Sequence, residues 1–138
     1  MKPIDSEMNC VPSLSVFFPL HNEETSVRPL AQTTLNLLAR LTAAYELILI
    51  DDGSDDATGA ICDELAKSEP HVRVVHRAVN GGYGAAVREG LRHCTKDLIF
   101  YTDGDGQYDV RELPRLCEAL ADDVVMVNGY KIVRRDPW

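Results

Sequence analysis

The sequence predicts an α/β fold in which a doubly wound, mainly parallel sheet is flanked by helices. Short apolar runs, typical of strands buried on both faces, alternate with segments whose apolar residues recur at helical spacing. A polar or glycine-rich loop follows four of these runs, and ligands of such sheets bind outside the carboxyl ends of the strands. We therefore expect a ligand site built from those loops, which are residues 20–24, 51–54, 80–84 and 103–107.

The first part of the chain carries two of the expected strands. Residues 14–18 form the first apolar run, which we expect to end at Pro19 because proline has no backbone N–H to donate to a sheet. Leucines at helical spacing then predict a helix over about residues 27–42. The next apolar run predicts a strand over residues 45–50, directly before an acidic loop.

A second helix and a third strand are expected after that loop. The helix would place Ala57, Ile61 and Leu65 on one face and acid in its first turn, where the helix dipole favours negative charge. Pro70 is expected to close this helix, and residues 72–76 form the next strand-like run. Strands that alternate in this way with helices pair in parallel.

The remaining part of the chain repeats the alternation. Small and apolar residues over 85–91 predict a helix that packs closely on its neighbour, and residues 98–101 predict the fourth strand. Residues 124–127 predict a fifth strand. Between these strands we expect a helix whose inward residues are Val110, Leu113, Leu116, Cys117 and Leu120.

The composition excludes several classes of protein. The 138 residues have a formal net charge of -8, which argues against general nucleic-acid binding because that requires a basic face. No apolar run approaches the length of a membrane span, and the polar residues 1–13 lack the apolar core of a signal peptide. The four cysteines include no C-x-x-C pair, which predicts reduced thiols and a cytoplasmic protein. The four histidines have no ligand spacing, so each is expected to be structural or solvated.

Asp103 and Asp105 stand two residues apart immediately after the fourth expected strand. In an extended segment this spacing points both carboxylates the same way, so they can converge on one cation, while Gly104 and Gly106 let a ligand approach the backbone. A cation held by two carboxylates keeps positions open for phosphate oxygens, which is how Mg²⁺ or Mn²⁺ is usually held in nucleotide enzymes. The alternative is an ordinary Asp and Gly turn that leads into a helix capped by Asp109.

Four other binding motifs do not match. A dinucleotide fold would carry its glycine fingerprint after the first strand, where this chain has residues 19–23, and no Walker A motif occurs. A calcium loop that began at Asp103 would need Glu at its twelfth position, which is Pro114. A receiver-type phosphoacceptor domain places its paired acids after the first strand, whereas Asp51 and Asp52 follow the second.

Four motifs at the expected strand ends carry a family resemblance. They read F-P-L-H-N-E-E at residues 18–24, I-D-D-G-S-D-D at 50–56, N-G-G-Y-G-A-A at 80–86 and D-G-D-G-Q at 103–107. In this order they resemble a family 2 glycosyltransferase with the GT-A fold, closest to polyprenyl-phosphate sugar transferases of the dolichol-phosphate mannose type. The resemblance covers residues from about 13 to 138 and implies a GT-A, Rossmann-like sheet.

The resemblance implies a nucleotide-sugar pocket made by three of the motifs. Asp51 would lie near the base, and the loop that contains Gly81 and Gly84 would approach the ribose and diphosphate. The family often has Lys or Arg where this chain has Gly82 and Tyr83. The residues that would bind the substrate are Pro19, Asn22, Glu23, Asp51, Asp52, Gly53, Ser54, Gly81 and Gly84.

The resemblance also implies the catalytic part of the site. Asp103 and Asp105 would be the D-x-D acids that bind Mn²⁺ or Mg²⁺, and Gln107 would help to coordinate the ion. Lys131 falls where the dolichol-phosphate branch has an Arg that contacts phosphate. A bound cation would neutralise the diphosphate leaving group as the sugar carbon gains positive charge.

The implied reaction is a metal-dependent, inverting transfer from a UDP- or GDP-linked sugar to a polyprenyl phosphate or a glycan acceptor. A hydroxyl acceptor needs a general base, whereas a polyprenyl phosphate arrives largely ionised because the second pKa of a phosphate monoester is near ~6. No candidate base is evident after Asp109, which favours the lipid phosphate. Such a protein would work in the cytoplasm or at the cytoplasmic face of a membrane.

Two other functions stay open at this stage. One is a non-catalytic fragment or regulatory module that binds a nucleotide sugar, and turnover would distinguish it from an enzyme. The other is a metal-dependent nucleotidyltransferase, which would normally offer a basic, glycine-rich loop after the first strand. Residues 20–24 are acidic instead.

The domain organisation expected from the resemblance is a polar leader over residues 1–13 and a single GT-A domain over residues 14–138. The family normally continues into an acceptor-binding half and, in many members, membrane-associated helices. We therefore expect this domain to be cut short at its C-terminal end. The basic residues 131–135 would then begin a further region, or else form a solvated tail.

Overall fold

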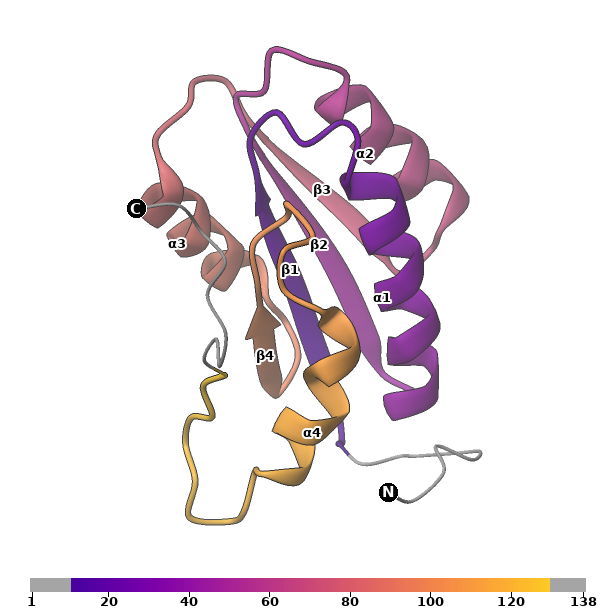
Figure 1. Cartoon of the computed structure of the whole chain (residues 1–138), viewed down its shortest axis with the longest axis vertical. Helices are drawn as coiled ribbons and strands as arrows, with labels where there is room; N and C mark the ends of the chain where they lie inside the picture. The colour runs from indigo at the N-terminus through magenta and orange to yellow at the C-terminus, as the bar shows by residue number, and fades with distance from the viewer. Residues whose placement is uncertain (1–10, 130–138) are drawn as a thin grey trace.

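The computed structural model describes residues 11–129 of the chain, and these residues contain a parallel sheet with helices on both faces (Figure 1). Because the strand order is β3-β2-β1-β4, β1 and β2 lie at the centre of the sheet and β4 lies at one edge. All three pairings are parallel. The four strands are β1 (Leu14–Leu20), β2 (Tyr45–Asp52), β3 (Val72–Arg77) and β4 (Leu98–Tyr101).

The helices divide between the two faces of the sheet, which confirms the doubly wound arrangement (Figure 1). One core contains Val16 and Phe18 of β1 together with apolar residues of the first, second and fourth helices. The other contains Phe17 of β1 and Ala86 of the third helix, as the alternation of side chains along a strand requires. The helices are α1 (Val27–Leu41), α2 (Thr58–Ser68), α3 (Tyr83–His93) and α4 (Leu113–Glu118), with a 3-10 turn η1 (Val110–Glu112) before α4.

The contact between α3 and β1 depends on a small residue, as the sequence predicted. Gly90 is buried, and a Cβ atom added there would collide with the ring of Phe17. The same ring also stacks on Tyr101 of β4, with the ring centroids 5.0 Å apart. Gly90 therefore sets how closely α3 approaches the centre of the sheet.

Pro19 lies inside β1, so the expectation that it ends the strand was wrong. It is in register with Ile50 of β2, and the strand continues to Leu20. The carbonyl oxygen of Pro19 points toward Gly104, on the side of β4. In a parallel strand the nitrogen of a residue points to the same side as its carbonyl, so the Pro19 nitrogen also points toward β4. The ladder with β4 has already ended at Phe17, so the missing N–H costs no sheet hydrogen bond.

The start of α2 also differs from the prediction. Ala57 is exposed and precedes the helix, and the first turn contains no acid. Acid is nevertheless placed at the helix N-terminus, because Asp56 accepts a hydrogen bond from the backbone N–H of Thr58 at 2.9 Å. The helix dipole is thus opposed by a residue just outside the helix.

The expected fifth strand at residues 124–127 is absent. Val125 is fully exposed and Met126 is 74% exposed, and neither is paired with β4. The run has the residues of a strand, but a strand forms only where a neighbour supplies backbone partners and a surface to cover. Nothing in the described part of the chain supplies both.

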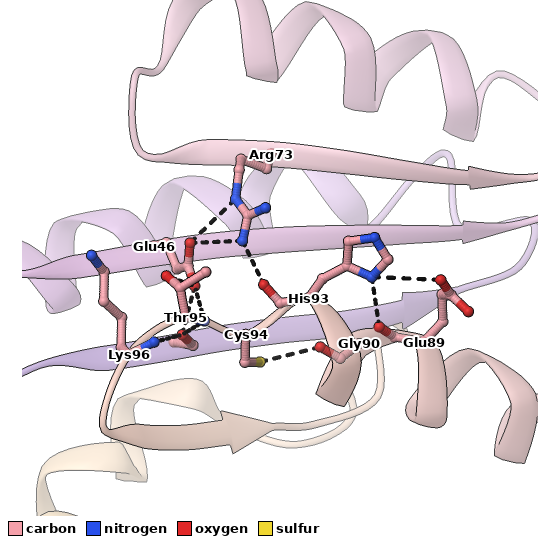
Figure 2. A network of polar contacts seen from close by, with 9 residues as sticks. Glu46, Arg73, Glu89, Gly90, His93, Cys94, Thr95 and Lys96 are labelled. Carbon is pink, nitrogen blue, oxygen red and sulfur yellow. Dashed lines mark hydrogen bonds and ion pairs between the residues drawn. The ribbon is translucent and has the colours of Figure 1, made fainter.

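A polar network at the amino end of the sheet joins β1, β2 and β3 to the connection between α3 and β4 (Figure 2). The buried Glu46 carboxylate accepts hydrogen bonds from the Ser15 hydroxyl at 2.7 Å, the Thr95 backbone N–H at 2.8 Å and Arg73 Nη2 at 2.8 Å. The same Arg73 nitrogen donates to the carbonyl of His93 at 2.6 Å. Burial by itself would raise the pKa of Glu46, but the hydrogen bonds prevail and lower it to about 2.

Candidate functional site

The four polar loops meet at the carboxyl edge of the sheet, as the sequence predicted. The loop after β1 contacts the loop after β4, because the Ser26 hydroxyl donates to the carbonyl of Gly104 at 2.8 Å. The same loop reaches the two others through His21, whose Nδ1 lies 3.0 Å from the carbonyl oxygen of Asp52 and whose Nε2 lies 3.2 Å from the Asn80 side-chain nitrogen. One edge of the sheet thus carries a continuous polar surface drawn from four separate segments.

Asn22 locks the loop after β1 to the loop after β2. Its backbone N–H donates to the Ser54 hydroxyl at 3.1 Å, and its side-chain oxygen accepts from the backbone N–H of Asp55 at 2.8 Å. Asn22 also has a φ of 54°, a left-handed conformation that asparagine tolerates better than most residues. Glu23 is joined to the same region, because its N–H donates to the Thr58 hydroxyl at 2.8 Å.

Asp52 holds the glycine-rich loop against β2. Its Oδ1 accepts from the backbone N–H of Gly81 at 3.1 Å and from Arg77 Nε at 3.0 Å. Gly53 adopts a φ of +63°, and a Cβ atom there would lie 2.5 Å from the nitrogen of Asn80. Only glycine lets the two loops approach this closely, so Asp52 and Gly53 together fix the position of the third loop against the end of β2.

Two glycines of the third loop are not required for packing. A Cβ atom added at Gly82 or Gly84 would meet nothing within 4 Å. Glycine is nonetheless favoured at position 82, because its φ of +87° is a backbone conformation that other residues rarely adopt. The space over Gly84 lies at the first turn of α3, where backbone N–H groups point away from the helix.

Asp51 is buried at the end of β2, with 6% of its surface exposed. Its Oδ1 accepts from the backbone N–H of Ser54 at 3.2 Å, and its Oδ2 lies 2.9 Å from His76 Nδ1. The other ring nitrogen of His76 lies 2.7 Å from Asp63 Oδ1 on α2. Sequence reasoning expected His76 to be structural or solvated, and its position near the end of the third apolar run was the one available signal. The register that places it opposite Asp51 appears only in the structure.

Asp103 and Asp105 lie on a turn that its central glycine anchors. Gly104 is buried, and a Cβ atom there would lie 3.1 Å from the Pro19 carbonyl oxygen and would collide with Leu20. Asp105 Oδ1 accepts from the backbone N–H of Gln107 at 2.9 Å. The turn is therefore held to β1 through its backbone, while both acidic side chains stay partly exposed.

The two acids have no cationic partner within residues 11–129, where neither forms an ion pair. Two carboxylates fit a hard divalent cation, which prefers oxygen ligands and can take the others from a phosphate. Over the same residues no group of three or more His, Cys, Asp and Glu side chains is placed to hold a metal. The turn after β4 thus carries two acids without a cationic partner among the described residues. Lys131, the expected phosphate contact, lies outside those residues.

Tyr83 links the third loop to this turn. Burial raises the pKa of Tyr83 to about 12, together with the hydrogen bond between its hydroxyl group and the Asp103 carboxylate. The hydroxyl therefore stays protonated at neutral pH and donates to Asp103. The third loop thus places a neutral hydrogen-bond donor beside Asp103.

The cysteines that the structure describes are free thiols, in agreement with the sequence prediction. Cys62 and Cys117 are buried and Cys94 is partly buried. Burial and the negative charges of Asp51 and Asp63 raise the pKa of the Cys62 thiol to about 12. Between residues 11 and 129, no helix is both long and apolar enough to cross a membrane.

Comparison with known families identifies the class of protein. The family described as Glycosyl transferase family 2 matches residues 15–137, which is most of the chain. The chain therefore belongs to glycosyltransferase family 2, as the loop motifs predicted.

Curated relatives narrow the comparison within that family. The chain is 35% identical over 130 residues to the undecaprenyl-phosphate 4-deoxy-4-formamido-L-arabinose transferase of Sodalis glossinidius, a match that covers 93% of this chain and 40% of the relative. It is 36% identical over 127 residues to the transferase of the same name from Klebsiella pneumoniae, covering 91% of this chain and 39% of the relative. The chain thus spans about two fifths of the length of these relatives.

Solved structures agree with the fold. A mannosyltransferase from Pyrobaculum calidifontis in complex with GDP-mannose and Mn²⁺ superposes with a TM-score of 0.65 at 25% identity, over 88% of this chain and 36% of that one. A glucosyl-3-phosphoglycerate synthase from Mycobacterium tuberculosis in complex with Mn²⁺ and UDP-glucose gives a TM-score of 0.56 at 25% identity, over 71% of this chain and 35% of that one. These likenesses confirm the GT-A fold class.

Proposed function

We propose that this chain binds a nucleotide-diphosphate sugar across the four loops and supplies the donor half of a sugar transferase that acts on a polyprenyl phosphate. The observation that carries the proposal is the pairing of two features on one sheet edge. A buried Asp51 lies at the end of β2, and two acids that have no cationic partner within residues 11–129 lie after β4. The loops between them are held together by hydrogen bonds, so the site is largely formed before a ligand binds.

In this proposal the loops divide the donor between them. Asp51 accepts a hydrogen bond from the base, and the first turn of α3, where Gly84 leaves open space, receives the diphosphate. Asp103 and Asp105 hold Mn²⁺ or Mg²⁺, with Gln107 as a further oxygen ligand. Pro19, Asn22, Glu23, Asp52, Gly53, Ser54 and Gly81 shape the walls, and Lys131 contacts phosphate.

The proposed chemistry follows from the charges that these residues place around the donor. A divalent ion, when bound, would neutralise the diphosphate as it leaves the sugar. Asp103 and Asp105 orient that end of the donor, and the buried Asp51 fixes the opposite end. A lipid phosphate attacks without a general base because it is already ionised, which favours an inverting, single displacement. The names of the relatives, which refer to undecaprenyl phosphate, support this acceptor.

Calorimetric titration of UDP-glucose and of GDP-mannose, with and without Mn²⁺, tests the donor site. We expect one donor to bind in the presence of Mn²⁺ and the double variant Asp103→Ala/Asp105→Ala to lose at least about tenfold in affinity, since each removed carboxylate is a direct ligand. The matched control is Asp122→Ala/Asp123→Ala, which removes two exposed acids after α4. Equal affinity of the site variant and the control would contradict the metal assignment.

A transfer assay distinguishes an enzyme from a binding module. The donor that binds is incubated with undecaprenyl phosphate and Mn²⁺, and glycolipid formation is followed. Transfer that is lost in Asp103→Ala/Asp105→Ala supports the enzyme. Donor binding without any transfer supports the non-catalytic alternative.

A further inference from the structure

The strongest feature that the proposed function leaves unused is a pair of side chains, His76 and Asp63, that continues from Asp51. His76, at the end of β3, lies between Asp51 on β2 and Asp63 on α2, with one ring nitrogen within hydrogen-bonding distance of each carboxylate. The two distances are 2.9 and 2.7 Å. A histidine that faces two carboxylate acceptors donates to both only when both nitrogens carry protons.

The surroundings of these three side chains limit how they can move. A Cβ atom added at Gly59 of α2 would lie 2.8 Å from Asp51 Oδ2 and 3.5 Å from His76 Cε1, so the helix backbone closes over the pair. The neighbouring Arg77 is directed to Asp52 instead. The charged groups that face His76 are therefore Asp51 on β2 and Asp63 on α2, and the thiol of Cys62 nearby stays neutral.

The contacts also decide which oxygen of Asp51 a ligand can use. Oδ2 is occupied by His76 beneath Gly59. Oδ1 faces the loop at Ser54, and among the described residues it accepts one hydrogen bond, at 3.2 Å. A carboxylate oxygen can accept two. The remaining acceptor position suits a base with a ring N–H next to a carbonyl group, such as uracil or guanine.

We propose that His76 is a positioning residue for the base end of the donor site, acting with Asp63 to aim Oδ1 of Asp51 at the ring N–H of uracil or guanine. This inference rests on the proposed function. The doubly protonated ring holds Asp51 at one end and is itself held by Asp63 at the other. Loss of one proton breaks one of the two links, because a bare ring nitrogen then faces a carboxylate oxygen. Donor affinity therefore falls as pH rises through the titration of His76.

The test combines donor binding with a direct measurement on the ring. Affinity for UDP-glucose or GDP-mannose with Mn²⁺ is measured from about pH 5.5 to about pH 9, a range around the usual histidine value. The variants are His76→Gln and Asp63→Asn. The control is Glu64→Gln, which neutralises the adjacent acid of α2, an exposed residue paired with Arg28. Nitrogen NMR shifts of the His76 ring report its protonation independently of binding.

We expect wild type and Glu64→Gln to lose about fivefold to tenfold in affinity across the titration of His76, the size expected when one charge-assisted hydrogen bond is lost. The midpoint should lie at lower pH in Asp63→Asn, both in the binding curve and in the ring shifts. His76→Gln should bind weakly at every pH, with a flat profile. The difference in affinity between UDP-glucose and GDP-mannose should become smaller as the affinity falls.

Two outcomes would overturn the inference separately from the proposed function. If His76→Gln binds donor as tightly as wild type, or Asp63→Asn leaves the binding midpoint unmoved while the ring titration shifts, His76 does not position Asp51. Asp51→Asn tests the proposed contact between Asp51 and the base directly, because it should weaken donor binding whether or not His76 positions Asp51. Failure of wild type to bind any donor at any pH would overturn the proposed function and this inference with it.

Discussion

Glu46 shows how much one side chain can contribute to this small domain. It accepts hydrogen bonds from Ser15, Thr95 and Arg73 while only 8% exposed, and its pKa falls from 4.5 to about 2. The charged form is therefore favoured in the folded state by roughly 3 kcal/mol, since one pKa unit corresponds to about 1.4 kcal/mol. The Glu46 network thus stabilises the amino end of the sheet.

We predict that Glu46→Gln lowers the free energy of unfolding at neutral pH by about 2–3 kcal/mol, because an amide N–H₂ group would face donors instead of accepting from them. Urea unfolding measures the change, with Glu118→Gln on the exposed surface of α4 as the control. The folded pKa is depressed, so this stability is present above about pH 4.5 and is lost as pH falls toward 2. A difference between wild type and variant that does not shrink in acid would contradict the assignment.

Gly90 gives a second prediction about one residue. We expect Gly90→Ala to destabilise the fold by about 1–3 kcal/mol, because the added methyl group would overlap the Phe17 ring, which is also stacked on Tyr101. Gly84→Ala, in the same helix with open space around it, is the matched control and should be neutral or stabilising by up to about 1 kcal/mol. Thermal unfolding of both variants shows whether packing or helix propensity determines the effect of alanine on the stability of α3.

At the scale of elements, residues 124–127 show that a strand-like composition does not by itself produce a strand. They are apolar enough for a strand, yet Val125 and Met126 are exposed and no strand of the described sheet pairs with this segment. Their contribution to the stability of the described fold should therefore be small.

We predict that Val125→Ser/Met126→Ser changes the free energy of unfolding by less than about 0.5 kcal/mol, the size usual for exposed positions. A buried pair of similar size, Val16→Ser/Leu49→Ser, should abolish folding and serves as the contrast. A loss above about 1 kcal/mol in the first variant would show that this segment packs on the sheet.

Across the whole molecule, donor binding and folding are linked because the proposed site draws on loops from four strands. A ligand that binds only the folded state stabilises it by about 2.7 kcal/mol when present at 100 times its dissociation constant. We predict that the matching donor with Mn²⁺ raises the melting temperature by roughly 5–10 °C. The same mixture should leave Asp103→Ala/Asp105→Ala almost unchanged, and an equal rise in that variant would place the donor elsewhere.

The sequence by itself determined the strand and helix order, the parallel sheet and the edge on which the polar loops gather. These follow from apolar periodicity and from the fact that parallel strands all end on one side, so local patterns suffice. The same patterns located Asp51, Asp103 and Asp105 at strand ends, whereas the close packing that requires glycine at positions 53 and 104 was seen only in the structure.

Only the tertiary structure decided what depends on partners distant in the chain. Pro19 continues its strand because β4 has already stopped pairing beside it, and residues 124–127 form none because no partner adjoins them. His76 meets both Asp51 and Asp63, and Glu46 meets Ser15, Arg73 and Thr95, through the register of separate strands. The periodicity of the sequence indicates which face of an element a residue lies on. Its hydrogen bonds and ion pairs depend on which residue the fold places opposite it.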